Sequence, residues 1–469
     1  MKHTHTHFAN AKSLLGLLSF LFPITLLAQH ENTINLNASV NNVLNPCISV
    51  AQYDIIKQSC NNNAITLGLN SSIQKKPMTI TLVWPLQQKA GVKDCNYYII
   101  TNNVDVDATS GVKDYNCGTR TYNGHRGTDI VPTPYPFYKL DHNLVEVIAA
   151  ADGIIVSKAD SNFDKNCTTG ANPYHGNYIA LQHADGSRTL YYHMKKYSLT
   201  TKTIGMAVTK GEFLGIVGSS GSSNIPHLHF EVWAEGNSNT LNDPYAGACN
   251  TLNATSRWTY QRPYKEPGLA KLQVNKIAPV LPTCPATETP NEDSCFDLGT
   301  TTARFYRWMK DDTIGLVTQM RILNAAGSVL DSWTGTSTTT YNLALYNSTR
   351  NLPSTAGFYT YEAIFKNDTC RKVFKMNCSV TGLNEIKNEH ELSVYPNPFS
   401  NEATFYTNKP LKQASLLLYN AQGQLVKHIK NINGQEYILQ RELLPNGIYF
   451  AQIIQDQIPI YSKKIIITW

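Results

Sequence analysis

The 469-residue sequence is poor in charge. Asp, Glu, Lys and Arg together make up 16% of it, and no run of five or six like charges occurs. A net charge of +6 is too small, over this length, for the basic stripe of a nucleic-acid-binding protein. The low charge also excludes a coiled coil, and the 42% hydrophobic content excludes a disordered chain. We therefore expect a globular protein that binds no nucleic acid.

Long apolar runs are almost absent. The clearest one, residues 14–27, follows Lys2 and Lys12, is interrupted by Pro23, and is shorter than the roughly 20 residues of a membrane span. It ends in Leu-Leu-Ala-Gln, and a basic start, a short apolar core and a small residue at the cut are typical of a secretory signal peptide. The sequence thus predicts a signal peptide at residues 1–28, a secreted or cell-surface protein, and no transmembrane segment.

Cysteine occurs ten times, but no two cysteines have the C-x-x-C spacing of a zinc site, so a cysteine-bound metal is not expected. An even number of cysteines in an exported chain indicates disulfide bonds instead. Connectivity does not follow from sequence, and the simplest expectation is that neighbours pair, as Cys47–Cys60, Cys95–Cys117 and Cys284–Cys295.

Tyrosine, by contrast, is abundant, with 26 residues, and it favours the half-buried surface of a sheet. Short strand-like segments separated by turn signals begin at residue 78, and no segment sustains a 3.6-residue apolar period. The expected fold class is all-β, with a β-sheet domain followed by two small β-sandwich domains. Composition divides the chain into a signal peptide (1–28), a pro-region or accessory segment (29–77), the β-sheet domain (78–262), a proline-rich linker (263–295), an immunoglobulin-like sandwich that binds substrate or acts as a spacer (296–380), a polar linker (381–391) and a C-terminal block (392–469).

Candidate metal-binding residues lie in two short segments. Polar and apolar residues alternate from His227 to Val232, so His227 and His229 leave the same face of a strand. His125 and Asp129 are four residues apart, so on an extended strand their side chains would also leave one face. Gly127 lies between them on that face and leaves room for an ion. Two imidazoles and one carboxylate are the three protein ligands of a catalytic zinc site that keeps its fourth position for water.

A His-x-His pair is a weak signal by itself, because His3, His5 and His7 have the same spacing inside the predicted signal peptide. One alternative is a pair of solvated strand histidines. Another is a non-haem iron site, which also uses two histidines and a carboxylate. Export through an oxidising compartment, and a further histidine between apolar neighbours, His193, favour a hydrolytic zinc site over iron.

Three segments resemble the lysostaphin-type zinc endopeptidases (peptidase family M23-like), which cut the peptide part of the bacterial cell wall. They are, in order, Gly124–Ile130, Gly176–Gly186 leading to Tyr192-His193, and Gly215–Ser223 leading to His227–Val232. The resemblance implies a lysostaphin-like β-sheet domain with one zinc ion per chain, bound by His125, Asp129 and His229. It also implies a catalytic pair, His193 and His227, without deciding which is the base.

The same resemblance implies a secreted metalloendopeptidase that hydrolyses peptide bonds in the stems or cross-links of peptidoglycan. Two alternatives stay open: an endopeptidase for extracellular protein substrates, and a non-catalytic cell-wall-binding protein of the same fold. The choice of bond depends on the shape of the substrate pocket, which the sequence does not give.

The C-terminal block resembles the sorting domain of type IX secretion. The residues that carry the resemblance are Leu392–Pro398, Tyr419–Val426, Leu444–Tyr449 and the closing strand with Lys463 and Lys464. It implies that the type IX secretion machinery is a partner of the chain. The alternative is one more small adhesive sandwich.

Overall fold

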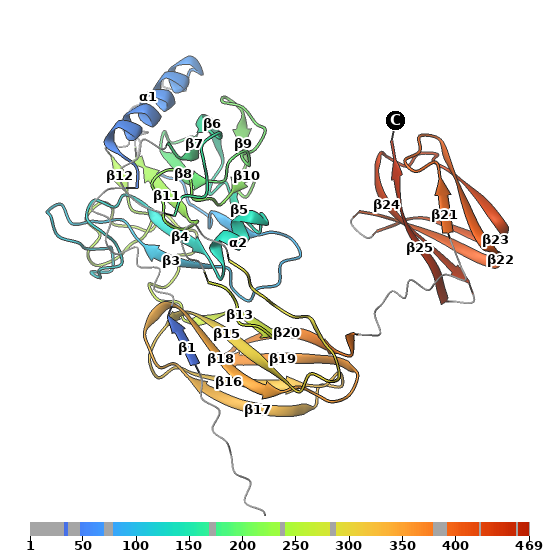
Figure 1. The fold of residues 1–469 in the computed structure, drawn as a ribbon. Helices are drawn as coiled ribbons and strands as arrows, with labels where there is room; N and C mark the ends of the chain where they lie inside the picture. Colours follow the sequence, from blue (N-terminus) through green and yellow to red (C-terminus); the bar gives the residue numbers. More distant parts are fainter. Residues whose placement is uncertain are drawn as a thin grey trace, which may run out of the picture. The chain divides into compact units, whose positions relative to one another are not determined.

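The computed structural model describes residues 32–35, 47–69, 78–167, 175–234, 240–281, 288–378, 392–421, 424–455 and 458–468. These ranges hold 25 strands and two helices (Figure 1), which confirms the expected all-β fold class. The predicted signal peptide at 1–28 and linker at 381–391 lie outside them. None of the helices described is long and apolar enough to cross a membrane. The chain forms two compact units, residues 1–294 with 300–374, and residues 295–299 with 375–469.

An antiparallel sheet of eight strands is the centre of the first unit. In spatial order it consists of β3 (Tyr98–Asn102), β4 (Thr128–Pro132), β11 (Leu228–Trp233), β8 (Arg188–Met194), β7 (Asn177–Gln182), β6 (Gly153–Ala159) and β9 (Ala207–Val208), with β12 (Leu241–Asn242) paired to β11. A three-stranded sheet accompanies it, in the order β10 (Phe213–Ile216), β5 (Val145–Ile148) and β2 (Leu86–Gln88), and α2 (Pro136–Asp141) follows β4.

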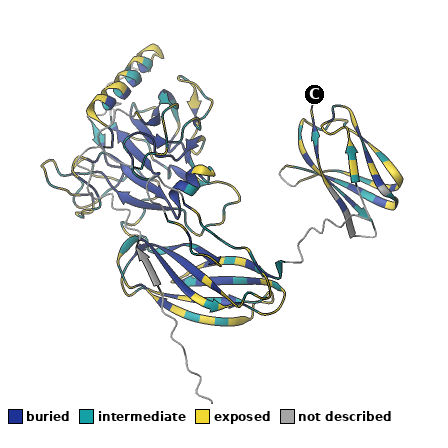
Figure 2. Cartoon of the chain, in the orientation of Figure 1, coloured by how far each residue is buried: buried dark blue, intermediate teal, exposed yellow. Residues whose placement is uncertain are grey.

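Both faces of the eight-stranded sheet are covered. One face supplies Leu228, Phe230 and Val232 of β11 to a core shared with the three-stranded sheet. The other face packs against α1 (Val50–Thr66), through a cluster that includes Ile56 of the helix and Trp233 of β11. Central strands are consequently buried along their whole length (Figure 2).

Helix α1 was not expected from the sequence. Its buried residues are Gln52, Ile56, Cys60 and Ala64, one every four positions, so the buried stripe is narrow. Because one of these side chains is polar and another is a single methyl group, the stripe gives almost no apolar periodicity. Ser49 caps the start of the helix, and its hydroxyl accepts a hydrogen bond from the backbone N–H of Gln52.

The sandwich is larger than predicted, and most of it belongs to the first unit; residues 295–296 and 375–376 at its edge belong to the second. One sheet has the order β1 (Asn32–Asn35), β18 (Tyr341–Asn351), β15 (Thr302–Asp312) and β13 (Gly268–Asn275), and the other the order β14 (Cys295–Phe296), β20 (Asp368–Met376), β19 (Gly357–Phe365), β16 (Val317–Leu323) and β17 (Val329–Thr336). Strand β13 lies within 263–295, so a linker over that whole range is wrong. The prolines that suggested it flank Gly268–Asn275, which contains none.

Side chains and a disulfide fix this sandwich to the eight-stranded sheet. The Tyr135 ring packs edge-on to Trp308 at a centroid distance of 5.0 Å, and the Tyr135 hydroxyl and the Trp308 indole N–H both donate to Gln273 Oε1 at 2.7 Å. Cys95, just before β3, is bonded to Cys370 in β20. The sandwich is therefore a structural part of the first unit.

The neighbour pairing of cysteines was wrong. Disulfides for which both cysteines lie in the described ranges are Cys95–Cys370, Cys117–Cys249 and Cys295–Cys378, while Cys47 and Cys60 are free thiols. The first two join segments separated by 275 and 132 residues, because the sheets bring distant segments together. Sequence proximity therefore says little about pairing in this chain.

The C-terminal block, taken by itself, is a five-stranded antiparallel sheet with its own core. Its strands are β21 (Leu392–Tyr395), β22 (Glu402–Asn420), β24 (Gly447–Gln455) and β25 (Ile458–Ile467), with β23 (Leu425–Gln440) paired to β22. Its buried cluster, which includes Phe405, Leu418 and Ile465, consists of residues from 392–467 alone.

The disulfide between β20 and the segment before β3 gives a first prediction. The double variant Cys95→Ser/Cys370→Ser should lose about 2–5 kcal/mol of stability, because the bond closes a very long loop in the unfolded chain. Urea unfolding followed by tryptophan fluorescence measures this loss. Cys60→Ser, which replaces a buried free thiol, is the matched control. An unchanged midpoint in the double variant would contradict a stabilising role for the bond.

Candidate metal centre and catalytic histidines

All five residues predicted for the site lie together, and each is at most 6% exposed. Strand pairing explains part of this arrangement, because β4 and β11 are in a register that sets Asp129 directly opposite His229. On the other side of β11, His229 is opposite Tyr192 of β8, so His193 is one residue away. His125 lies three residues before β4 and His227 one residue before β11.

Three donor atoms converge on one point. His125 Nε2 lies 3.2 Å from His229 Nδ1 and 3.1 Å from Asp129 Oδ2, and His229 Nδ1 lies 2.9 Å from Asp129 Oδ1. Ligands bound to zinc at about 2.0–2.2 Å in a tetrahedron are roughly 3.3–3.5 Å apart. The spacing and the chemistry of this donor set therefore fit a zinc ion.

Hydrogen bonds on the far side of each ring fix which nitrogen faces that point. His125 Nδ1–H donates to the backbone carbonyl of Asn103 at 2.6 Å, which leaves the Nε2 lone pair available. His229 Nε2–H donates to Glu231 Oε1 at 2.8 Å, which leaves Nδ1 available. Such outer partners orient metal-binding histidines and raise their basicity.

These outer partners are candidate functional positions that the sequence interpretation missed. Asn102 donates its side-chain N–H to Asp129 Oδ2 at 2.9 Å, and the Trp233 indole N–H donates to Glu231 Oε2 at 2.6 Å. Glu231 is completely buried and shares the parity of His229 on β11. The alternation that selected His229 could therefore have selected Glu231 as well.

The two remaining histidines share a different arrangement. His193 Nδ1–H donates to the Ser220 carbonyl at 2.6 Å, and His227 Nδ1–H donates to the Ile225 carbonyl at 2.8 Å. Their rings are 4.4 Å apart between centroids. Both Nε2 atoms can accept a proton, and that of His193 is buried with no hydrogen-bond partner among the described residues.

His193 reaches this position through an unusual backbone conformation. By strand parity it would share the face of Tyr191, which belongs to the core on the opposite side of the sheet from Tyr192. Instead its φ is +66°, in the left-handed region that residues other than glycine rarely adopt. Strain of this kind costs about 1–3 kcal/mol and is typical of functional sites.

Burial and charge set the protonation states of the site. Burial lowers the pKa of His227 to about 4 in spite of the nearby Asp129 carboxylate, so this imidazole is neutral at pH 7. Burial raises the pKa of Asp129, but its interactions with His125 and His227 and its hydrogen bonds with His125 and His229 outweigh burial and hold that pKa well below its usual value. Burial lowers the pKa of His125, whereas Asp129 raises it to about 9, so metal binding at His125 would release a proton.

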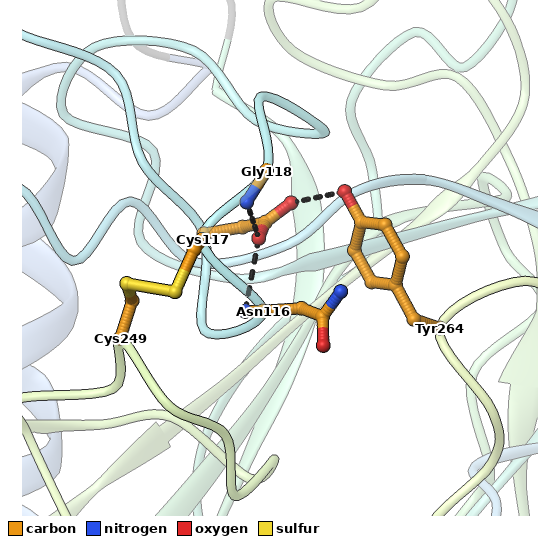
Figure 3. The surroundings of a disulfide bond; sticks show 6 residues. Asn116, Cys117, Gly118, Cys249 and Tyr264 are labelled. Carbon is orange, nitrogen blue, oxygen red and sulfur yellow. Dashed lines mark hydrogen bonds between the residues drawn. A yellow bond between two sulfur atoms is a disulfide. The ribbon is translucent and has the colours of Figure 1, made fainter.

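The loop that carries His125 is held by a disulfide and a buried carboxylate. Figure 3 shows the Cys117–Cys249 bond beside Asn116, Gly118 and Tyr264. The carboxylate of Asp114 accepts hydrogen bonds from the backbone N–H groups of Asn116 and Gly118, at 3.0 and 2.8 Å, and from the Tyr264 hydroxyl at 2.6 Å. These hydrogen bonds give partners to backbone N–H groups of a loop that belongs to none of the described strands.

A cysteine also approaches the centre. Cys47 Sγ lies 3.4 Å from His229 Nδ1, and Cys47, His125 and His229 form a buried group with metal-ligand spacing. This differs from the expectation that no cysteine takes part in a metal site. The C-x-x-C spacing rule could not detect it, because Cys47 is 182 residues from His229.

Comparison with known proteins agrees with both resemblances. Residues 124–242 match Peptidase family M23, and residues 393–468 match the Secretion system C-terminal sorting domain. The first range contains all five predicted site residues. The chain thus carries a domain of this peptidase family and a sorting domain, and the second marks it as a secreted or cell-surface protein.

Individual relatives match only part of the chain. It is 32% identical over 113 residues to the peptidoglycan DD-endopeptidase ShyA of Vibrio cholerae, which covers 24% of this chain and 21% of that protein. It is 37% identical over 90 residues to the DD-carboxypeptidase/endopeptidase Mpg of Neisseria meningitidis, which covers 19% and 17%. The chain spans about a fifth of the length of these curated relatives. The lysostaphin catalytic domain from Staphylococcus simulans aligns with 34% of this chain and 96% of its own, at 24% identity and a TM-score of 0.20.

Close packing of Gly127 gives a second prediction. A Cβ at this position would lie 2.7–2.8 Å from the His229 ring and from the Phe230 carbonyl oxygen, so Gly127→Ala must displace the ring. Zinc affinity should fall about 10–100-fold, the usual effect of disturbing the support of a ligand. Titration against a chromophoric chelator measures it. Gly299→Ala, whose Cβ would meet nothing within 4 Å, should bind zinc as the parent does. Equal affinity of both variants would show that Gly127 has no such role.

Proposed function

We propose that this protein is an exported zinc metalloendopeptidase that hydrolyses peptide bonds in the stems or cross-links of peptidoglycan. The observation that carries the proposal is the convergence of His125 Nε2, His229 Nδ1 and the Asp129 carboxylate on one point. The match to Peptidase family M23 supports the reaction class. Relatives named as peptidoglycan DD-endopeptidases support the substrate class.

In this proposal His125, Asp129 and His229 hold one zinc ion per chain. When bound, zinc polarises the scissile carbonyl and lowers the pKa of its water toward 7. Asn103 and Glu231 keep the two imidazoles in the tautomers that can bind metal.

His193 and His227 move the protons. Each donates Nδ1–H to a backbone carbonyl, so each presents Nε2 to the reacting atoms. One Nε2 accepts the proton of the attacking water, and the other, once protonated, donates to the oxyanion or to the leaving amine. The backbone carbonyls of Ser220 and Ile225 keep both rings from rotating, so no reorganisation is needed at the moment of reaction.

Export involves two ends of the chain. Residues 393–468 match a sorting domain, and we assign the type IX secretion machinery as their partner. Residues 1–28 act as the signal peptide for the first export step. The C-terminal block has its own core and contributes none of the five site residues, which supports a role in transport.

Replacing site residues should separate metal binding from proton transfer. His229→Ala should lose both zinc and activity, because it removes a ligand. His193→Ala and His227→Ala should keep about one zinc per chain and lose at least about 100-fold in turnover, the usual size of a general acid–base contribution. Elemental analysis and peptide-release rates measure the two properties. If either of the latter variants loses zinc as completely as His229→Ala, the assignment of roles is wrong.

Digestion of purified peptidoglycan identifies the bond. The zinc-loaded chain, with Cys47→Ser in parallel because Cys47 approaches the centre, should convert cross-linked muropeptide dimers to monomers, with mass spectrometry locating the cut. His229→Ala is the inactive control. Intact dimers together with cleavage of denatured casein would assign the activity to protein substrates instead. Binding to the sacculus without any cleavage would indicate a non-catalytic cell-wall-binding protein.

Truncation tests the sorting role. A chain ending at Gly382 should fold, keep its zinc and cleave at the parental rate, because the core of the C-terminal block is its own. In the native host this truncated protein should accumulate in the periplasm, whereas the full chain reaches the medium or the cell surface. Immunoblots of the fractions measure this distribution. Normal release of the truncated protein would exclude the sorting role, and a large loss of purified activity would place the block in the catalytic unit.

A further inference from the structure

The segment that precedes α1 brings a thiol to the metal centre. Cys47 Sγ lies 3.4 Å from His229 Nδ1, the nitrogen turned toward the metal, and 4.0 Å from Nε2 of the same ring. The Cys47 sulfur, one ring nitrogen of His125 and one ring nitrogen of His229 all lie within 4.8 Å of one another. At a Zn–S distance of about 2.3 Å, a tetrahedral thiolate would lie about 3.5–3.6 Å from a histidine nitrogen. Cys47 Sγ thus lies at ligand spacing from the two histidine ligands, in a group that does not include Asp129.

Helix α1 holds this thiol in place through apolar packing. Ile48 and Ile56 are fully buried and belong to one cluster with Val156 of β6 and Leu190 of β8. These strands belong to the sheet that carries Asp129 and His229. The segment that carries Cys47 is therefore packed into a hydrophobic core. Burial of this kind is worth about 1.5–3 kcal/mol per large side chain.

Polar contacts fix the orientation of the helix. Arg188 of β8 donates to Asn61 Oδ1 at 2.8 Å, and Asn63 donates its side-chain N–H to the Val156 carbonyl at 2.9 Å. The hydroxyls of Ser59 and Ser157 are hydrogen-bonded at 2.8 Å. Together with the apolar cluster, these bonds define one register of α1 on the sheet.

The helix also reaches the outer partners of the metal ligands. The Tyr53 hydroxyl donates to Glu231 Oε1, the oxygen that accepts from His229. The Arg126 guanidinium lies over the Tyr53 ring at 5.2 Å and its Nε is 3.9 Å from Glu231 Oε2. Residues 47–53 thus contact both His229 and the carboxylate that orients it.

This arrangement is unlike an open catalytic site. A catalytic zinc keeps one position for water or substrate, whereas a site closed by four protein ligands is structural. His125, His193 and His229 are at most 1% exposed beneath this segment, although an endopeptidase must admit a polypeptide to them.

We propose that Cys47 is a fourth protein ligand of the zinc ion, and that residues 47–69 are an inhibitory segment that keeps the peptidase latent. This inference rests on the proposed function, because it requires the metal centre. Cys47 binds as the thiolate and its proton passes to solvent. With the segment displaced, a zinc ion held by His125, Asp129 and His229 would have its fourth position free for water, and substrate could reach His193 and His227.

X-ray absorption at the zinc edge tests the coordination without relying on activity. The zinc-loaded full chain should show one sulfur neighbour at about 2.3 Å beside nitrogen and oxygen neighbours at about 2.0–2.2 Å. Cys47→Ser should lose the sulfur neighbour and keep the zinc. Cys60→Ser, which removes the other free thiol from the same segment, should keep the sulfur neighbour.

Activity gives the second measurement. Cys47→Ser should raise the rate of muropeptide cleavage by on the order of tenfold or more, since only the small population with Cys47 displaced is competent in the parent chain. Cys60→Ser keeps the Cys47 ligand and should therefore raise that rate far less than Cys47→Ser.

The outcomes distinguish this inference from the proposed function. A zinc shell of nitrogen and oxygen alone in the parent chain would overturn the role of Cys47 and leave the metallopeptidase standing. A sulfur shell that persists in Cys47→Ser, or a rate that falls in this variant, would also overturn the inference. Failure of both the parent and Cys47→Ser to retain zinc would overturn the proposed function itself.

Discussion

The antiparallel register of β4 against β11 is the constraint on which the site depends. It sets Asp129 opposite His229, and a slip of one residue would move one of them to the other face of the sheet. The register is enforced by Leu228 and Phe230, which alternate with His229 and fill the core behind it. Apolar packing on one face therefore determines where His229 and Asp129 lie on the other face.

Much of this geometry could be predicted from alternation along the strands. Residues two apart on β11, and residues four apart at the start of β4, share a face. Alternation therefore predicted which faces His229 and Asp129 occupy, and the strand register sets the two residues opposite each other. His193 follows a different rule, because its left-handed backbone takes it off the face that alternation assigns to it. Its apolar neighbours drew attention to it in the sequence, and its catalytic role was only what the resemblance implies.

Other features depended on contacts between distant segments, which sequence patterns do not report. The buried stripe of α1 contains Gln52 and Cys60, so the sequence of the helix does not reveal which of its faces packs against the sheet. Strand β13 lies between prolines and was assigned to a linker, yet it pairs with β15 from Gly268 to Asn275. The disulfides and the approach of Cys47 to His229 follow from the same long-range packing.

Strand β1 has a consequence for how the chain is made. Asn32 is opposite Asn347 of β18, so the first described strand finds its partner only after most of the protein has been synthesised. Such non-local pairing is slow to form, because the entropy of closing a long loop must be overcome before any contact compensates for it. Until β18 has been synthesised, the four residues of β1 therefore lack the strand with which they pair in the folded protein.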